Sequence, residues 1–344
     1  MIDQLDNGQT QAVPPIALTM GEPAGVGGET TLMAWKRRNS NVPCFFAIDS
    51  TERLQKLSET IGLDVPVAAI SSPSEAAGQF EYALPVLEQS LAAADVPGSP
   101  DPANAPSVCA SIERAVGLVN DGQASAVVTN PIQKACLYDA GFTYPGHTEY
   151  LAALAKIGTP PVMMLLCPRL RVVPVTIHVS LGEALKTLDA TAIETTAEIT
   201  ATALKNDFAI NQPRLAIAGL NPHAGEDGSM GREEIDIIAP AVERLRAKGI
   251  NAVGPLPPDT LFTPRARTTY DAAICMYHDQ ALIPIKALDF DGGVNATLGL
   301  PFVRTSPDHG TALDIAGHGR ANPGSLIAAL RTAYAMARRR ASKT

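Results

Sequence analysis

Short apolar runs alternate along the chain with longer segments in which apolar residues recur every three or four positions. The apolar runs cover residues 16–20, 44–48, 126–129, 162–166, 172–177, 215–218 and 272–276. The segments with helical spacing cover residues 29–38, 51–61, 108–119 and 235–245. Such runs predict buried strands, and their alternation with helical segments predicts parallel strands joined by crossover helices. We therefore expect an α/β fold with a mostly parallel sheet.

The composition is that of a globular protein and excludes several other classes. The chain has 344 residues, of which 46% are hydrophobic and 18% charged, which is enough apolar material for two domains or one large domain. The net charge is −8, so we expect no nucleic-acid partner. No apolar stretch reaches the length of a membrane span. Five scattered cysteines are typical of free thiols in a reducing compartment, which favours the cytoplasm.

Three histidines share one position relative to the predicted strands. His178, His223 and His278 each follow the carboxyl end of an apolar run, where open α/β sheets bind their ligands. Their spacings of 45 and 55 residues exclude a local zinc finger and suit a metal site assembled from separate strands. Each could equally be an ordinary loop or core histidine, so the residues alone leave both interpretations open.

Other polar residues could serve an anionic substrate. Asp279 adjoins His278 and could orient that imidazole or accept a proton. His147 and Thr148 precede a helical pattern, and they could either cap that helix or present its free N–H groups to an anion.

A lysine and an arginine in mostly apolar surroundings are the pair of side chains expected to bind a phosphate or a carboxylate. Lys286 and Arg304 fit this description, with Asn295 between them, although solvated surface charges would look the same. Residues 21–28 (GEPAGVGG) have the glycine density of a phosphate-binding loop but lack the dinucleotide fingerprint and the P-loop lysine and serine.

Five motifs together resemble the 4-hydroxythreonine-4-phosphate dehydrogenase family of vitamin B6 biosynthesis. In chain order they are MGEPAGVG (20–27), PGHTEYLA (145–152), GLNPHAGE (219–226), YDAAICMYHDQ (270–280) and VNATLGLPFVRTSPDHGTA (294–312). The resemblance extends from about Ile16 to Arg338. The chain departs from common family residues at Gly28, at 179–181 and at Ala281, and none of these is a ligand position.

The resemblance implies two α/β domains with a mostly parallel sheet, as in isocitrate and isopropylmalate dehydrogenases, with the active site in the interdomain cleft at a dimer interface. We place the first domain at 15–133 plus 305–344 and the second at 134–304. The implied metal ligands, for one Zn, Mg or Co ion, are His178, His223 and His278. The implied substrate-binding positions are His147, Thr148, Lys286, Asn295 and Arg304. The family motif gives His309 no role.

The family oxidises 4-phosphooxy-L-threonine with NAD or NADP to 2-amino-3-oxo-4-phosphooxybutanoate, which loses carbon dioxide to give 3-amino-2-oxopropyl phosphate. We expect this reaction here, from a homodimer, with Asp279 and Lys286 as candidate catalytic residues. One alternative is a paralogue that oxidises 4-phosphothreonate or an aromatic cis-dihydrodiol. Others are a phosphate-acyl transferase of related architecture and a metal-binding protein without enzyme activity. The residues that bind the nicotinamide cofactor stay unassigned.

Overall fold

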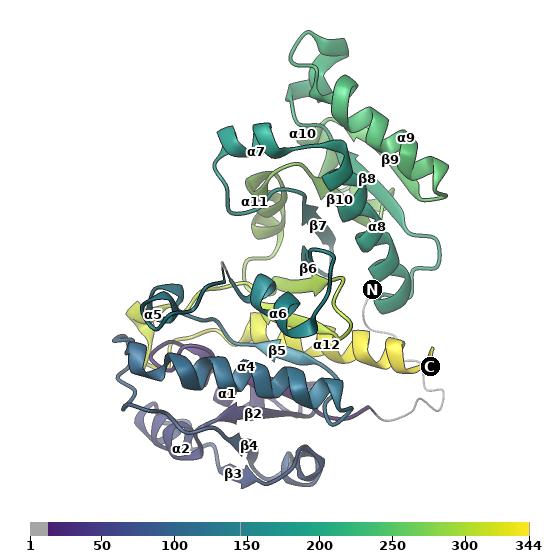
Figure 1. Ribbon diagram of the computed structural model, residues 1–344. Coiled ribbons are helices and arrows are strands. Elements are labelled where there is room, and N and C mark those ends of the chain that lie inside the picture. Colours follow the sequence, from purple (N-terminus) through teal and green to yellow (C-terminus); the bar gives the residue numbers. More distant parts are fainter. Residues whose placement is uncertain (1–12, 145, 344) are drawn as a thin grey trace. The chain divides into compact units, whose positions relative to one another are not determined.

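A computed structural model describes residues 13–144 and 146–343, which fall into two compact units (Figure 1). We call residues 162–299 the central unit and residues 13–161 with 300–343 the terminal unit. The division lies at 161/162 and 299/300, whereas we expected it at 133/134 and 304/305. Residues 134–161 belong to the terminal unit because Leu137, Tyr150 and Leu151 are buried in its core.

The strands of the terminal unit are β1 (Ile16–Thr19), β2 (Phe45–Asp49), β3 (Val67–Ile70), β4 (Leu84–Glu88), β5 (Val127–Thr129) and β12 (Arg304–Pro307). Its helices are α1 (Gly27–Lys36), α2 (Thr51–Thr60), α3 (Ala76–Gln79), α4 (Ala105–Asn120), α5 (Lys134–Asp139), α6 (His147–Ala155) and α12 (Gly324–Ala341).

These strands lie in the order β3-β4-β2-β1-β5-β12 and pair in parallel. Alternate side chains of a strand point to opposite faces of its sheet. Ala17, Phe46 and Ile48 join a buried cluster with α4 and α6 on one face. On the other face lies α12, which contacts β1, β5 and β12 (Figure 1). Burial on both faces explains why β1, β2 and β5 are continuous apolar runs.

The strands of the central unit are β6 (Val162–Cys167), β7 (Leu170–Pro174), β8 (Arg214–Ala218), β9 (Asn251–Leu256), β10 (Ala272–Cys275) and β11 (Val294–Leu298). Its helices are α7 (Leu181–Thr187), α8 (Ala190–Asp207), α9 (Ala239–Ala247), α10 (Pro258–Leu261) and α11 (His278–Leu288), with a π-helical turn at Glu234–Ile238 before α9.

The central strands lie in the order β11-β6-β7-β10-β8-β9. β7, β10, β8 and β9 pair in parallel, whereas β6 is antiparallel to both of its neighbours. Only Pro168 and Arg169 separate β6 from β7, a connection too short for the crossover that parallel strands need. Helix α11 packs on one face through Ala281 and Ile285, and α8 contacts β6, β8, β10 and β11.

The expected α/β architecture with a mostly parallel sheet is confirmed by this arrangement. Among the residues that the structure describes, no helix combines the length and the apolar character needed to cross a membrane.

Candidate active site

The three segments that carry the candidate metal ligands leave the same edge of the central sheet. β7, β10 and β8 are neighbours and run in parallel, so their carboxyl ends lie together. His178 follows β7, His223 follows β8, and His278 is the first residue of α11, just after β10. The predicted position of each histidine beyond a strand end is confirmed.

Two of the three imidazoles lie close together. The ring centroids of His178 and His278 are 5.8 Å apart, with the ring planes tilted by 44°. Two imidazoles on one tetrahedral zinc ion would have centroids about 5 Å apart, so this pair fits a shared metal ion. Within 13–144 and 146–343, no three His, Cys, Asp or Glu side chains form a group that could hold a metal. The structure therefore brings together two of the predicted ligands and places His223 on a neighbouring loop.

Side chains tie the three loops to one another. Thr176 Oγ1 donates to the carbonyl oxygen of Met276 (2.8 Å), which joins the loop after β7 to the one after β10. Gln280 is buried, and its Oε1 accepts from the N–H of Met276 (2.6 Å). Its Nε2 donates to the carbonyl oxygen of Gly219 (2.7 Å), just beyond β8. Gln280 thus fixes the start of α11 against the segment that leads to His223.

That segment has an unusual backbone. From His223 to Asp227 every residue has a positive φ, between 41° and 80°, and four of the five are not glycine. Such a conformation is unfavourable for residues with a Cβ and needs support from its surroundings. The buried carboxylate of Glu234 holds the backbone just before this stretch, because its Oε1 accepts from the N–H groups of Leu220 and Asn221, both at 2.7 Å.

The remaining candidates of the central unit lie on α11 and β11. Asp279 is exposed, and its Oδ1 lies 3.4 Å from Nδ1 of His278. Lys286 places its Nζ 5.4 Å from the ring centroid of Phe290. Asn295 pairs with β6, and its buried Oδ1 accepts no hydrogen bond from the described residues. That orphaned oxygen is consistent with a ligand-binding role.

In the terminal unit, the charge of Arg304 acts on the imidazole of His147. The Nε2 of His147 is buried and has no hydrogen-bond partner among the described residues. Burial, and then the charges of Arg304 and Lys134, hold the pKa of His147 well below its usual value. Arg304 is 2% exposed and donates from Nη2 to Oγ1 of Thr129 (2.6 Å), and burial lowers the pKa of its guanidinium to about 10. Thr148 occupies the first turn of α6, half-buried.

The glycine-rich segment 21–28 proves to be a packing element. A Cβ on Gly21 would lie 2.6 Å from the carbonyl oxygen of Pro131, and one on Gly25 would lie 2.8 Å from that of Thr311. Two N–H groups of the segment bond to backbone outside it, since Glu22 donates to Pro131 and Val26 donates to Thr311. The glycines therefore allow close approach between backbones.

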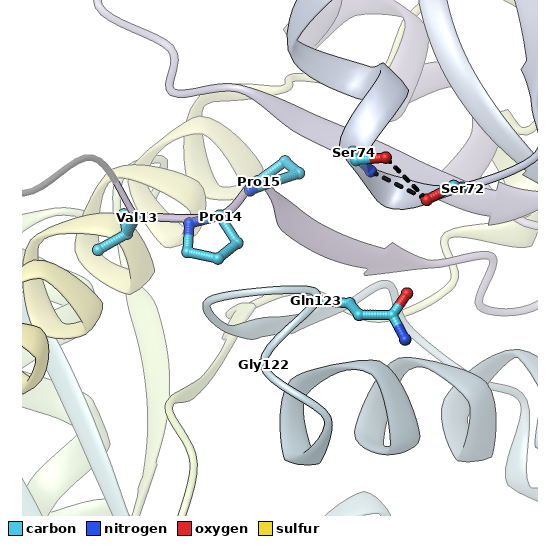
Figure 2. A pocket seen from close by; sticks show the side chains of 7 residues that line it. All are labelled: Val13, Pro14, Pro15, Ser72, Ser74, Gly122 and Gln123. Atoms are coloured by element: carbon cyan, nitrogen blue, oxygen red, sulfur yellow. Dashed lines mark hydrogen bonds between the residues drawn. The ribbon is translucent and has the colours of Figure 1, made fainter.

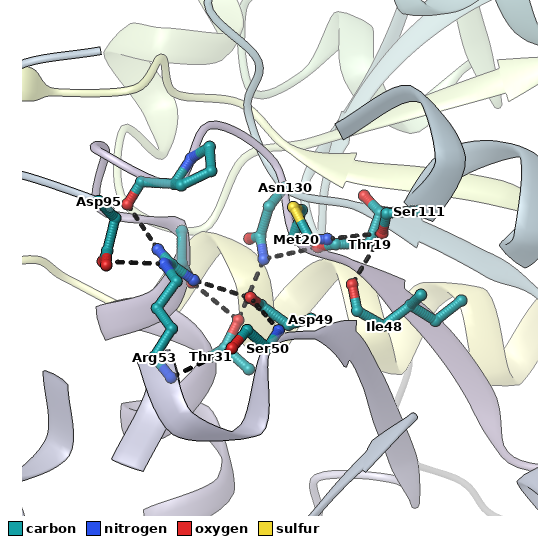
Figure 3. Close-up of polar contacts among 12 residues, drawn as sticks. Thr19, Met20, Thr31, Ile48, Asp49, Ser50, Arg53, Asp95, Ser111 and Asn130 are labelled. Atoms are coloured by element: carbon teal, nitrogen blue, oxygen red, sulfur yellow. Dashed lines mark hydrogen bonds and ion pairs between the residues drawn. The ribbon is translucent and has the colours of Figure 1, made fainter. Parts of the chain in front are cut away.

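A buried ion network supports this segment (Figure 3). Arg53, 4% exposed, contacts Asp49 (Nη1 to Oδ2, 2.8 Å) and Asp95 (Nε to Oδ2, 3.1 Å). Its Nη2 also donates to the carbonyl oxygen of Pro23 in the glycine-rich segment (2.6 Å). Figure 3 also shows Asn130, whose Nδ2 donates to the carbonyl oxygen of Thr19 (3.0 Å).

A surface pocket of about 350 Å³ lies elsewhere in the terminal unit (Figure 2). It is lined by Val13, Pro14, Pro15, Ser72, Ser74, Gly122 and Gln123. None of these side chains carries a charge, and none belongs to the predicted site. The pocket therefore lacks the cationic groups that bind a phosphorylated substrate.

Comparison with known proteins decides the family. Residues 41–333 match the family model described as pyridoxal phosphate biosynthetic protein PdxA. The chain belongs to the PdxA family. It is 55% identical to a 4-hydroxythreonine-4-phosphate dehydrogenase of Bradyrhizobium diazoefficiens, over 95% of this chain and 98% of that protein. Identity to the Caulobacter vibrioides enzyme of the same name is 53%, with the same coverage.

Solved structures agree with this membership of the PdxA family. The 4-hydroxythreonine-4-phosphate dehydrogenase of Klebsiella pneumoniae superposes with a TM-score of 0.83 at 38% identity, over 94% of this chain and 99% of that one. A terephthalate 1,2-cis-dihydrodiol dehydrogenase from Burkholderia xenovorans gives 0.62 at 26% identity, over 94% and 98%. A phosphotransacylase from Enterococcus faecalis shares only the fold, with 0.55 at 12% identity over 94% and 99%.

Sequence reasoning did not single out three residues that lie beside predicted site residues or fix the loops that carry them. Gln280 lies inside the YDAAICMYHDQ motif, but its partners are backbone groups, one at Met276 nearby and one at Gly219 in a distant loop. Glu234 lies outside every motif, and only its position beside Leu220 reveals its role. Lys134 is the third, since the charge it places near His147 depends on how α5 and α6 fold.

Proposed function

We propose that this chain oxidises 4-phosphooxy-L-threonine with NAD or NADP to 2-amino-3-oxo-4-phosphooxybutanoate, which decarboxylates to 3-amino-2-oxopropyl phosphate. The observation that carries the proposal is the near full-length match to relatives named 4-hydroxythreonine-4-phosphate dehydrogenase. The tied histidine loops and the buried cationic site around Arg304 support it, because the substrate has a hydroxyl to be oxidised and a phosphate to be bound.

The metal ligands of the proposal are His178, His223 and His278. The pairing of two imidazoles and the position of the third on an adjacent loop fit a divalent ion, with Zn, Mg and Co as candidates. When bound, such an ion acts as a Lewis acid that favours loss of the hydroxyl proton and polarises the resulting ketone. In our proposal, the tie from Gln280 to Gly219 and the support from Glu234 hold these imidazoles in place.

The reaction transfers a hydride from C3 of the substrate to the nicotinamide ring and removes a proton from the C3 hydroxyl. Asp279 would orient the imidazole of His278 or accept that proton. In the central unit, Lys286 and Asn295 are the proposed substrate contacts, with the buried Oδ1 of Asn295 free to accept from a ligand. In the terminal unit, we propose His147, Thr148 and Arg304, whose groups can donate to oxygen atoms.

We further propose a homodimer that completes the metal site. Large apolar side chains are exposed beside the histidines, with Leu181 62% and Ile283 67% exposed on α7 and α11. A second copy would cover these side chains and bring its own ligands to the imidazole pair. Light scattering should give a dimer for the wild type and a monomer for Leu181→Asp, whereas Tyr82→Asp, at an exposed position of the terminal unit, should remain dimeric.

We place the enzyme in the cytoplasm because all five cysteines are free thiols in the structure.

The metal assignment is tested on the chain itself. His223→Ala should lower the metal content of the purified protein and abolish turnover, whereas His318→Ala, at an exposed position outside the predicted site, should leave both unchanged. Intact metal content and turnover in His223→Ala would contradict the assignment.

Oxidation of an aromatic cis-dihydrodiol is the second candidate function, favoured by the match to the Burkholderia xenovorans dehydrogenase.

A further inference from the structure

The first turn of α6 lies in a positively charged part of the terminal unit. Its N-cap residue is Gly146, and no side chain caps the N–H groups that follow. A Cβ built on Gly146 would lie 3.4 Å from Nζ of Lys134 and 3.2 Å from Oε2 of Glu149. The ammonium of Lys134 therefore sits beside the start of α6, with the carboxylate of Glu149 as the neighbouring acid.

A second, independent observation points to a ligand at the same place. The Nε2 atom of His147 is buried and makes no hydrogen bond with any described residue. Leaving a buried ring nitrogen unpaired costs free energy, which an incoming partner would recover. The guanidinium of Arg304, itself almost fully buried, and the ammonium of Lys134 both act electrostatically on this imidazole.

We propose that Lys134 is a further substrate-binding residue, which together with His147 and Arg304 binds the phosphate group of the substrate. This inference rests on the proposed function and deepens it. The substrate's phosphate and carboxylate both require cations, and the proposed function does not say which residues bind which group. Two cations, an imidazole and an uncapped helix N-terminus supply more donors than the two oxygens of a carboxylate can use. A dianionic phosphate with three terminal oxygens matches this donor set better.

The ammonium of Lys134 makes no hydrogen bond or ion pair with any residue in the described part of the chain. It is also exposed, so it can reorient toward an incoming anion without breaking an existing contact. The depressed pKa of His147 agrees with the proposal, since the imidazole stays neutral beside two cations until an anion offsets their charge.

The test compares Lys134→Met with Lys134→Arg and with Lys56→Met, where Lys56 is an exposed lysine on α2 whose side chain has no polar partner among the described residues. Each variant is assayed with 4-phosphooxy-L-threonine and with 4-hydroxy-L-threonine, which lacks the phosphate. Loss of one charge-assisted contact should lower kcat/KM of Lys134→Met for the phosphorylated substrate about 10- to 100-fold, mainly through KM. Activity with the unphosphorylated substrate should change by less than about twofold. Lys134→Arg should recover part of the loss, and Lys56→Met should match the wild type.

An equal loss with both substrates, or no loss with either, would overturn the assignment of Lys134 to the phosphate. Calorimetric titration of the unmodified chain and of Lys134→Met with inorganic phosphate gives a readout that needs no turnover. Binding at least about fivefold weaker in the variant supports the inference, and equal binding overturns it. If the wild type oxidises neither substrate, the proposed function fails, and the phosphate titration still decides the role of Lys134.

Discussion

Replacing Gln280 by leucine should weaken both the fold and the metal site. The side chain accepts from the N–H of Met276 at 2.6 Å and donates to the carbonyl oxygen of Gly219 at 2.7 Å, and all of these groups are buried. Leucine has a similar volume, so the substitution removes the two hydrogen bonds without opening a large cavity.

The magnitude follows from the two backbone groups left unpaired. A buried donor or acceptor without a partner costs about 1–3 kcal/mol, so Gln280→Leu should lower the free energy of unfolding by about 2–5 kcal/mol. The tie between the segments carrying His278 and His223 is lost as well. Removing a side chain that orients metal ligands typically lowers metal affinity about 10- to 100-fold, and we expect an effect of this size.

Urea unfolding of Gln280→Leu and competition with a metal chelator measure the two effects. Gln212→Leu is the matched control, because Gln212 is exposed in the same unit and should change stability by no more than about 0.5 kcal/mol. A loss below about 1 kcal/mol with unchanged metal affinity would show that the loops are held by other contacts.

Three further predictions concern the other buried polar groups. Glu234→Gln should cost about 1.5–3 kcal/mol in urea unfolding, because the charge that accepts from Leu220 and Asn221 is lost, and an unchanged midpoint would contradict this. Arg53→Met should cost about 3–5 kcal/mol by stranding the buried carboxylate of Asp49, and the double variant with Asp49→Asn should regain part of that loss. The lowered pKa of His147 means that the unfolded chain binds a proton at this residue more readily than the folded chain does. The contribution of His147 to stability is therefore complete above about pH 6.5 and decreases as the pH falls below that value. His147→Asn should make Tm fall less steeply as the pH is lowered. Identical slopes of Tm against pH in the variant and the wild type would contradict this prediction.

The apolar pattern was sufficient to predict the strands buried on both faces. β1, β2 and β10 are short continuous apolar runs, and the structure places each inside a sheet. β12 has the sequence Arg-Thr-Ser-Pro and gave no such signal, yet all four of its residues are buried. Its polar groups are buried because they form specific contacts, such as that of Arg304 with Thr129, which a hydrophobic pattern cannot reveal.

The long helices also differed in how clearly the amino-acid sequence predicts them. Helix α4 has a clear apolar stripe, whereas α8 carries buried threonines and a buried glutamate among its alanines. Glu194 ends in ion pairs with Arg244 and Lys248 on and next to α9, so its burial depends on a partner about 50 residues away. Helical spacing alone cannot supply such a partner.

The candidate site was predicted as far as strand topology allows. Positions after parallel strands converge because of the sheet, so the placement of His178, His223 and His278 could be inferred from apolar runs. The atoms that fix those loops are backbone carbonyl and N–H groups, which a sequence does not distinguish. The glycine-rich segment shows the converse, since close packing between backbones produces the same residue pattern as a phosphate-binding loop.

One measurement tests the central claim most directly. The purified protein is incubated with NAD or NADP and, separately, 4-phosphooxy-L-threonine, 4-phosphothreonate and an aromatic cis-dihydrodiol, and the reduced nicotinamide is followed by absorbance. We predict turnover with 4-phosphooxy-L-threonine that a chelator abolishes and a divalent metal ion restores. Turnover confined to either of the other two substrates, or turnover that the chelator leaves undiminished, would contradict the proposed function.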